Sequence, residues 1–114
     1  MHELGIAQSA LEAAISEMER HDSQRITALI LRIGDLAAVD PDALRFAFEA
    51  VTANTAAEGA KLGIERVQPV AWCAHCDDDF TTDAIGFFKC PRCGNYSGDL
   101  RAGREIELAR LELD

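Results

Sequence analysis

The chain has 114 residues and a formal net charge of −9 at pH 7, with 20 acidic residues against 11 Lys and Arg. This length suits one domain of ordinary size, or a domain that carries a small metal-held insert. The negative charge argues against a nucleic-acid partner, because binding to phosphates needs a basic surface. The sequence also contains no apolar run near the roughly 18 residues of a membrane-spanning helix, so we expect no membrane partner.

The first third of the chain predicts a helix followed by a strand. Between Leu4 and Met18, apolar residues recur at steps of three and four, which is the pattern of an amphipathic helix. Residues 25–33 are mostly apolar and rich in β-branched side chains, as in a central strand that is covered on both faces. Gly34 and Asp35 are expected to close that strand.

A second helix is predicted to begin at Asp40 and Pro41. Aspartate is a favoured N-cap residue, and proline is favoured at the first helical position. Gly59 is expected to end this element, because glycine commonly terminates helices. Asp40 could instead act as a hydrogen-bond acceptor near a site at the N-terminus, but capping explains the residue without that site and is the favoured role.

The second half of the chain predicts two strands separated by a cysteine-bearing segment. The strands are expected at 61–67 and 105–113. We therefore predict an α+β protein that consists of a small mixed β-sheet with two helices. A zinc-ribbon-like module is inserted between two of its strands. The expected domains are an α/β domain of residues 1–69 and 100–114, which carries the N-terminus, and a module of residues 70–99, which carries the four cysteines.

All four cysteines form two Cys-x-x-Cys pairs, Cys73 with Cys76 and Cys90 with Cys93, and thirteen residues separate the pairs. Each pair can offer two thiolates from one tight turn, and two such turns complete the tetrahedron of a structural Zn²⁺ site. Gly94 tolerates a positive φ, a conformation that lets backbone N–H groups point back at sulfur. The quartet therefore predicts a zinc site.

Paired cysteines also serve other chemistries than zinc binding. Two disulfides would suit a small secreted protein, but no signal peptide is visible in the sequence. A redox dithiol needs only one Cys-x-x-Cys pair. Iron remains a competitor, because Cys-Pro-x-Cys-Gly also occurs in rubredoxin-like iron sites. Zinc is favoured because closed four-thiolate sites usually hold it.

The start of the chain, Met1-His2-Glu3, can form a second metal site. The α-amine of Met1, the amide nitrogen of His2 and its imidazole Nδ1 can close adjoining chelate rings around one ion. The amide of Glu3 could complete a plane of nitrogens, which suits Ni²⁺ or Cu²⁺. From the residues alone, a histidine at position 2 is more often an ordinary surface residue at a frayed terminus.

Several motifs occur together in an order that resembles the HypA/HybF family of hydrogenase-maturation nickel metallochaperones. These are Met1-His2-Glu3-Leu4, the strand ending Ile33-Gly34, the turn at 57–62, Trp72 before the first cysteine pair, and Cys90-Pro91-Arg92-Cys93. The resemblance covers essentially the whole chain. It implies zinc at the four cysteines and delivery of nickel to [NiFe]-hydrogenase precursors, and in some organisms to urease.

The resemblance also implies roles for residues and partners. His2 would be the nickel residue, Met1 would contribute its amine, and Glu3 would lie beside the ion. Some family members have a histidine just after the fourth cysteine, whereas Gly94 and Asn95 stand there in this chain. The implied partners are a GTPase of the HypB type and the precursor of the hydrogenase large subunit, with a homodimer as a further option.

The predicted function is therefore a non-enzymatic nickel carrier with a structural zinc site. No catalytic triad, carboxylate pair or phosphate-binding loop occurs in the sequence, so we expect no enzymatic activity. A zinc-ribbon adaptor without nickel transfer, and a rubredoxin-like electron carrier, remain alternatives. His75 could tune the metal or sense pH, but with four thiolates present an exposed turn residue is the favoured interpretation. Paired thiols without a targeting segment indicate the cytoplasm.

Overall fold

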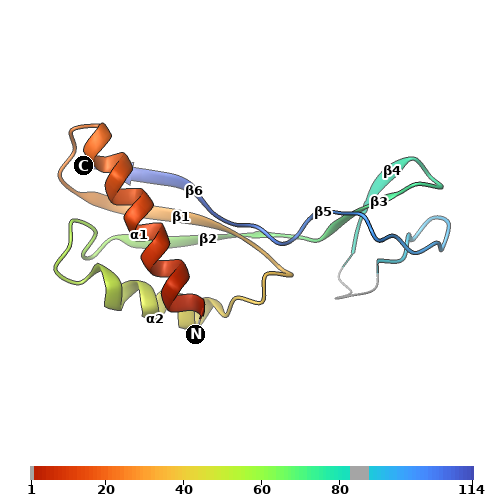
Figure 1. Ribbon diagram of the computed structural model, residues 1–114, viewed down its shortest axis with the longest axis horizontal. Coiled ribbons are helices and arrows are strands. Elements are labelled where there is room, and N and C mark those ends of the chain that lie inside the picture. The colour runs from red at the N-terminus through yellow and green to blue at the C-terminus, as the bar shows by residue number, and fades with distance from the viewer. Residues whose placement is uncertain (1, 83–87) are drawn as a thin grey trace. The chain divides into compact units, whose positions relative to one another are not determined.

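The computed structural model describes residues 2–82 and 88–114, and Figure 1 shows their arrangement into helices and strands. The elements, in chain order, are α1 (His2–Arg20), β1 (Ile26–Gly34), α2 (Pro41–Thr52), β2 (Lys61–Val67), β3 (Val70–Cys73), β4 (Asp78–Thr81), β5 (Leu100–Ala102) and β6 (Ile106–Leu113). None of the helices in these described segments is both long enough and apolar enough to span a bilayer.

The chain divides into two compact units. The first comprises Met1–Arg32, Val39–Glu65 and Ile106–Asp114, and the second comprises Ile33–Ala38 and Arg66–Glu105. The predicted module at 70–99 falls inside the second unit, and its assignment as a separate domain stays a prediction.

The first unit contains both helices and most of a three-stranded sheet in the order β2-β1-β6. The backbone of Asp114, just after β6, donates to the carbonyl of Arg25, just before β1, at 3.1 Å, so these strands run in opposite directions. Ile26 at the start of β1 donates to Ala56, ahead of β2, and Asp35 after β1 donates to Val67, where β2 ends. Strands β1 and β2 therefore run the same way, and the sheet is mixed.

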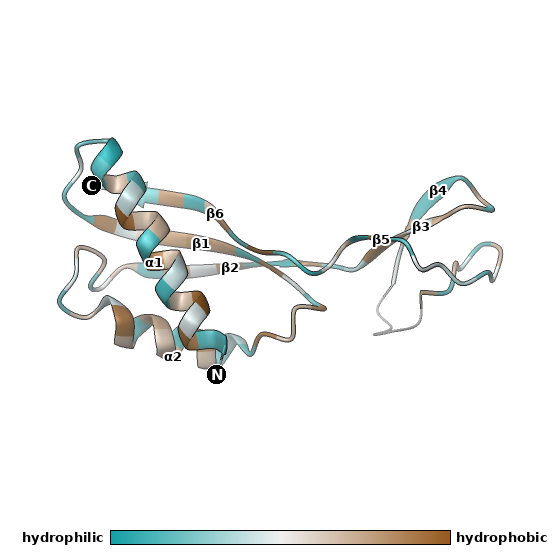
Figure 2. Ribbon diagram, in the orientation of Figure 1, coloured by the Kyte–Doolittle hydropathy of each residue, from teal (hydrophilic) through white to brown (hydrophobic). Residues whose placement is uncertain are grey.

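The core of the first unit follows the predicted periodicity. In α1 the buried apolar positions recur at steps of three and four, and they are Ala7, Ala10, Leu11, Ala14 and Met18. The central strand contributes Leu29 and Leu31, which are almost fully buried, and α2 contributes Leu44 and Phe48. Figure 2 shows the matching change from apolar to polar colour around α1. The amphipathic helix and the central strand predicted from sequence are confirmed.

Helix α2 ends earlier than the sequence indicated. It stops at Thr52 rather than at Gly59, and residues 53–59 form turns. The hydroxyl of Thr55 donates to the carbonyl of Thr52 at 2.6 Å, and Asn54 has a φ of 63°. The hydroxyl of Thr55 thus provides a hydrogen-bond donor for a carbonyl at the end of the helix, and the left-handed conformation of Asn54 turns the chain away. The helix therefore ends before Gly59 is reached. Gly59, with a φ of 78°, turns the chain towards β2.

The second unit is built around an antiparallel sheet in the order β4-β3-β5. Its register pairs Val70 with Thr81 and Cys73 with Asp78, which places the first cysteine opposite the start of β4. The buried cluster of this unit consists of Ala71, Cys73, Phe80 and Cys90. Two of these four side chains are thiols, so the core of this unit and the candidate metal centre are the same place.

Candidate metal centre

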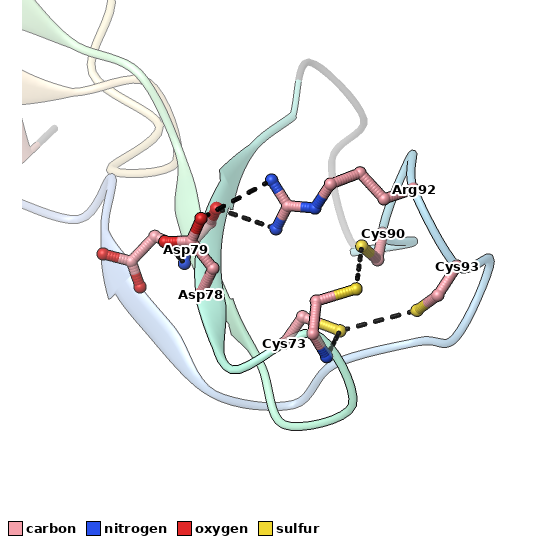
Figure 3. Close-up of polar contacts among 7 residues, drawn as sticks. Cys73, Asp78, Asp79, Cys90, Arg92 and Cys93 are labelled. Carbon is pink, nitrogen blue, oxygen red and sulfur yellow. Dashed lines mark hydrogen bonds and ion pairs between the residues drawn. The ribbon is translucent and has the colours of Figure 1, made fainter.

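The four cysteines lie together, as the sequence predicted. All four are free thiols, and their sulfur atoms lie within 4.8 Å of one another. The sulfurs of Cys73 and Cys93 are 3.5 Å apart, and those of Cys76 and Cys90 are 3.9 Å apart. Figure 3 shows these two sulfur pairs, each of which joins one cysteine of the first turn to one of the second.

These distances fit a tetrahedral metal site. With metal–sulfur bonds of about 2.3 Å, the edge of a regular four-thiolate tetrahedron is about 3.8 Å. The two measured sulfur separations, 3.5 and 3.9 Å, lie on either side of that value. The donor set thus fits zinc.

Backbone turns aim N–H groups at the sulfurs. The amide of Cys76 lies 3.4 Å from the sulfur of Cys73, and the amide of Asn95 lies 3.5 Å from that of Cys93. Gly94, between the fourth cysteine and Asn95, has a φ of 80°, as expected for the left-handed residue of this turn. Such N–H donors stabilise the negative charge of a thiolate.

The metal-free thiols differ in acidity. Burial of Cys90 favours its neutral thiol, but hydrogen bonds from the backbone N–H groups of Cys93 and Arg92, and then from neighbouring thiols, outweigh it. The pKa of Cys90 is lowered from 9.0 to about 6. At Cys76 a hydrogen bond from Arg92 favours the thiolate, yet burial and the other three thiols raise its pKa to about 11. The cluster therefore holds protons that a metal must displace.

His2 and Glu3 of the N-terminal motif lie in the first unit, at the start of α1. The carboxylate Oε2 of Glu3 lies 3.3 Å from Nε2 of His2. The same oxygen accepts a hydrogen bond from the backbone N–H of Asp40 at 3.1 Å. This bond, followed by one from its own backbone N–H, lowers the pKa of Glu3 below its ordinary value. Met1 lies outside the described residues.

Asp40 is a helix cap. Its side chain accepts hydrogen bonds from the N–H groups of Asp42 and Ala43, at 3.0 and 3.4 Å. The capping role predicted from sequence is confirmed. The contact of Asp40 with Glu3 runs through the backbone N–H, so it uses no part of the side chain. His75, inside the first cysteine turn, is exposed.

Two contacts were not predicted from sequence. The first is the bond between Glu3 and Asp40, which joins residues 37 positions apart. The second is the position of Arg92, whose guanidinium donates to the carbonyl of Asp79 at 3.2 Å and lies 3.8 Å from a carboxylate oxygen of Asp78. No local sequence pattern indicates either contact, because both depend on how segments that are distant in the sequence pack together.

A family model described as hydrogenase/urease nickel incorporation, metallochaperone, HypA matches residues 1–113. The chain belongs to the HypA family. Among its relatives, the hydrogenase maturation factor HypA of Geotalea uraniireducens is 41% identical over 114 residues, all of both chains. The HypA of Picosynechococcus is 42% identical over 113 residues, which is 99% of each chain.

Solved structures share the fold of this HypA-family chain. The solution structure of the Ni metallochaperone HypA from Helicobacter pylori matches with a TM-score of 0.71 at 22% identity, over 99% of this chain and 97% of the other. A second solution structure of HypA gives a TM-score of 0.72 at 23% identity, over 99% and 96% of the two chains. The α+β fold and the family predicted from sequence are both confirmed, and a metallochaperone has an accessory role rather than a catalytic one.

Proposed function

We propose that this HypA-family chain carries Ni²⁺ at its N-terminus for the maturation of [NiFe]-hydrogenase, or of urease, and holds a structural Zn²⁺ at its four cysteines. The observation that carries the proposal is the family match over residues 1–113. The gathered thiols and the arrangement of His2 and Glu3 support it independently.

The zinc assignment of Cys73, Cys76, Cys90 and Cys93 is supported by the chemistry of the cluster. Cys73 and Cys90 are 3% and 1% exposed, and four thiolates form the closed donor set typical of structural zinc. A closed set leaves no open position for a substrate. We therefore assign this metal to the structure of the second unit rather than to transfer.

For nickel we propose His2 and the amine of Met1 as ligands, in a chain that starts at Met1. Glu3 contacts Nε2 of the imidazole, and Nδ1 is the nitrogen that can form a chelate ring with the amine. Nitrogen donors in a plane suit Ni²⁺. We therefore regard Glu3 as a residue that orients His2, and only as a possible ligand.

The exposure of His2 suits a carrier. Its side chain is 56% exposed, so an ion bound there remains accessible to a recipient. We propose a GTPase of the HypB type and the hydrogenase large-subunit precursor as partners, a homodimer as a further assembly, and no enzymatic activity. Four free thiols suit the reducing cytoplasm, where we place this function.

Nickel titration of the zinc-loaded protein tests the proposal. We expect one equivalent of nickel to bind, and His2→Ala to lose it while the zinc content stays unchanged. His21→Ala is the matched control, because it removes an exposed histidine from just beyond the other end of α1. A chain that binds zinc but no nickel would support the adaptor function instead. A red protein with strong visible bands would indicate iron.

A further inference from the structure

A hollow of about 480 Å³ lies in the first unit, between helix α1 and strand β6. Small residues of α1, namely Gly5, Ser9 and Ala13, line one side, and Ile106 and Leu108 of β6 line the other. A second hollow, of about 540 Å³, continues along the same helix, and Ala13 and Leu108 line both. We call this continuous surface the α1–β6 furrow. Figure 1 shows the helix and the strand that form it.

The lining of the furrow is mostly apolar, and its acidic and basic side chains already have partners of opposite charge within the chain. These pairs are Glu107 with Arg32 at 3.0 Å, Arg110 with Glu112 at 3.3 Å, and Glu17 with Arg20 at 2.7 Å. At the rim, Ile106 leaves 47% of its surface in contact with solvent. The centres of protein interfaces are likewise poor in charge. The furrow therefore suits an uncharged, apolar segment of a partner.

Gly5 points to a close approach by another molecule. Among the described residues outside its own turn of helix, none comes within 4 Å of the Cβ that an alanine would place there. Packing within the chain therefore does not require a glycine at this position. Glycine inside a helix lowers stability relative to alanine, because it loses more backbone entropy on folding. Glycine does serve where a second molecule must come close to the backbone.

The furrow begins at the proposed nickel residue. His2 lines the first hollow together with Gly5, and its side chain is 56% exposed. A segment that lies in the furrow is therefore next to the imidazole. A metal ion passes directly from one protein to another only when ligands of both can reach it. This position suits the protein that receives the ion better than a partner that docks elsewhere.

We propose that the α1–β6 furrow is the docking surface for the protein that receives nickel, and that this recipient inserts an uncharged, apolar segment beside His2. The identity of the occupant rests on the nickel function proposed above. The shape and the chemistry of the furrow do not depend on it, so the two ideas can be tested separately.

The first experiment measures the affinity of the zinc-loaded, nickel-free chain for the purified precursor of the hydrogenase large subunit. Ala13→Arg places a charge where the two hollows meet, and we expect binding to weaken by about 100-fold or more, because a charge in an apolar contact loses its hydration. Ala50→Arg is the matched control, since it changes an exposed alanine of the other helix. Its affinity should stay within about twofold of that of the unchanged chain.

The second experiment compares stability and binding in Gly5→Ala. The urea midpoint of unfolding should rise, because alanine favours the helix. Binding of the precursor should nevertheless weaken by about 5- to 10-fold, because the added methyl group occupies space that the partner needs. Gly98→Ala is the control: it also adds a Cβ that meets nothing within 4 Å, but in the second unit, and it should leave the affinity unchanged. A residue that affected only the helix would change stability without changing affinity.

Three results would overturn the docking surface. They are equal affinities for Ala13→Arg and Ala50→Arg, unchanged binding in Gly5→Ala, and a free chain that sediments as a dimer which Ala13→Arg converts to monomers. The last result would identify a second copy of the chain as the occupant.

The function proposed above fails in a different way. A chain that binds the precursor through the furrow but takes up no nickel would contradict nickel transport and leave the docking surface in place. A chain that takes up nickel at His2 but does not bind the precursor would overturn the docking proposal and leave the nickel site in place.

Discussion

At the scale of single residues, the carboxylate of Glu3 links the proposed nickel residue to the second helix. It contacts the imidazole of His2 and accepts from the backbone of Asp40. Glu3 is only 9% exposed, so this contact lies under the surface while the ring of His2 stays accessible. An orienting group below an exposed ligand lets a carrier hold an ion in a defined geometry and still release it.

The amine of Met1 supplies a prediction at this scale. Adding two glycines before Met1 should abolish nickel binding while zinc content and stability stay almost unchanged. The added residues turn the amine into an amide, and the chelate then loses the donor that anchors its first ring. The fold should hardly respond, because terminal residues contribute little to a core.

Nickel stoichiometry and absorption spectra of three proteins test this prediction. They are the chain that starts at Met1, the glycine-extended chain and His2→Ala. The extended chain should behave like His2→Ala. If it keeps one planar nickel ion, the assignment of the amine is wrong.

At the scale of elements, Asp40 defines the start of α2. Replacing it with alanine removes the side-chain acceptor for two N–H groups, and such a loss costs about 1 kcal/mol of the free energy of unfolding. The bond to Glu3 survives, since it uses the backbone N–H that alanine retains. The measured loss therefore reports the cap alone.

Urea unfolding followed by the helical circular dichroism signal measures this loss, because both helices belong to the first unit. Asp42→Ala is the control: it removes an exposed carboxylate from the same first turn and should cost only a few tenths of a kcal/mol, through the helix dipole. Equal losses in the two variants would contradict a capping role for Asp40.

Elements with a strong local pattern were predictable, and elements defined by distant contacts were not. The spacing of Ala7, Leu11 and Met18 predicted α1, and the run of β-branched residues predicted β1. The strands β3, β4 and β5 are three or four residues long and exist through pairing with one another, so no periodicity identifies them. The early end of α2 was missed because it depends on local bonds of Thr55 rather than on glycine.

The candidate sites divide in the same way. The cysteine quartet was predictable because the spacing of each pair already matches a metal-binding turn. Arg92 was not, because its partners Asp78 and Asp79 come from the other cysteine segment and only folding brings them within reach. Sequence thus predicts the donors of a metal site better than the side chains that surround them.

At the scale of the whole molecule, the two units obtain their stability from different sources. The first buries a continuous set of aliphatic side chains from two helices and a strand, including Leu29, Leu31 and Leu44. In the second, Phe80 is the large apolar member of a buried cluster whose other members are Ala71, Cys73 and Cys90. Among the residues that the structure describes, this buried cluster is small, and we therefore expect the segment to need a metal to offset the entropy of its ordering.

The last prediction follows from this difference. Replacing Cys73 with serine should release zinc and unfold residues 70–99, while the two-helix unit stays folded, because the binding free energy of a structural zinc is also folding free energy. Amide hydrogen exchange of the zinc-loaded chain and of Cys73→Ser measures both parts at once. Amides of β3 and β4 should lose protection, and those of β1 around Leu29 should keep theirs and so serve as the internal control.

Removing zinc from the unchanged chain with a chelator should reproduce the pattern, which separates loss of metal from an effect of the serine itself. Equal protection of β3 and β4 with and without zinc would contradict this prediction. It would show that the second unit folds without metal, so that the cysteines would bind zinc without contributing to folding.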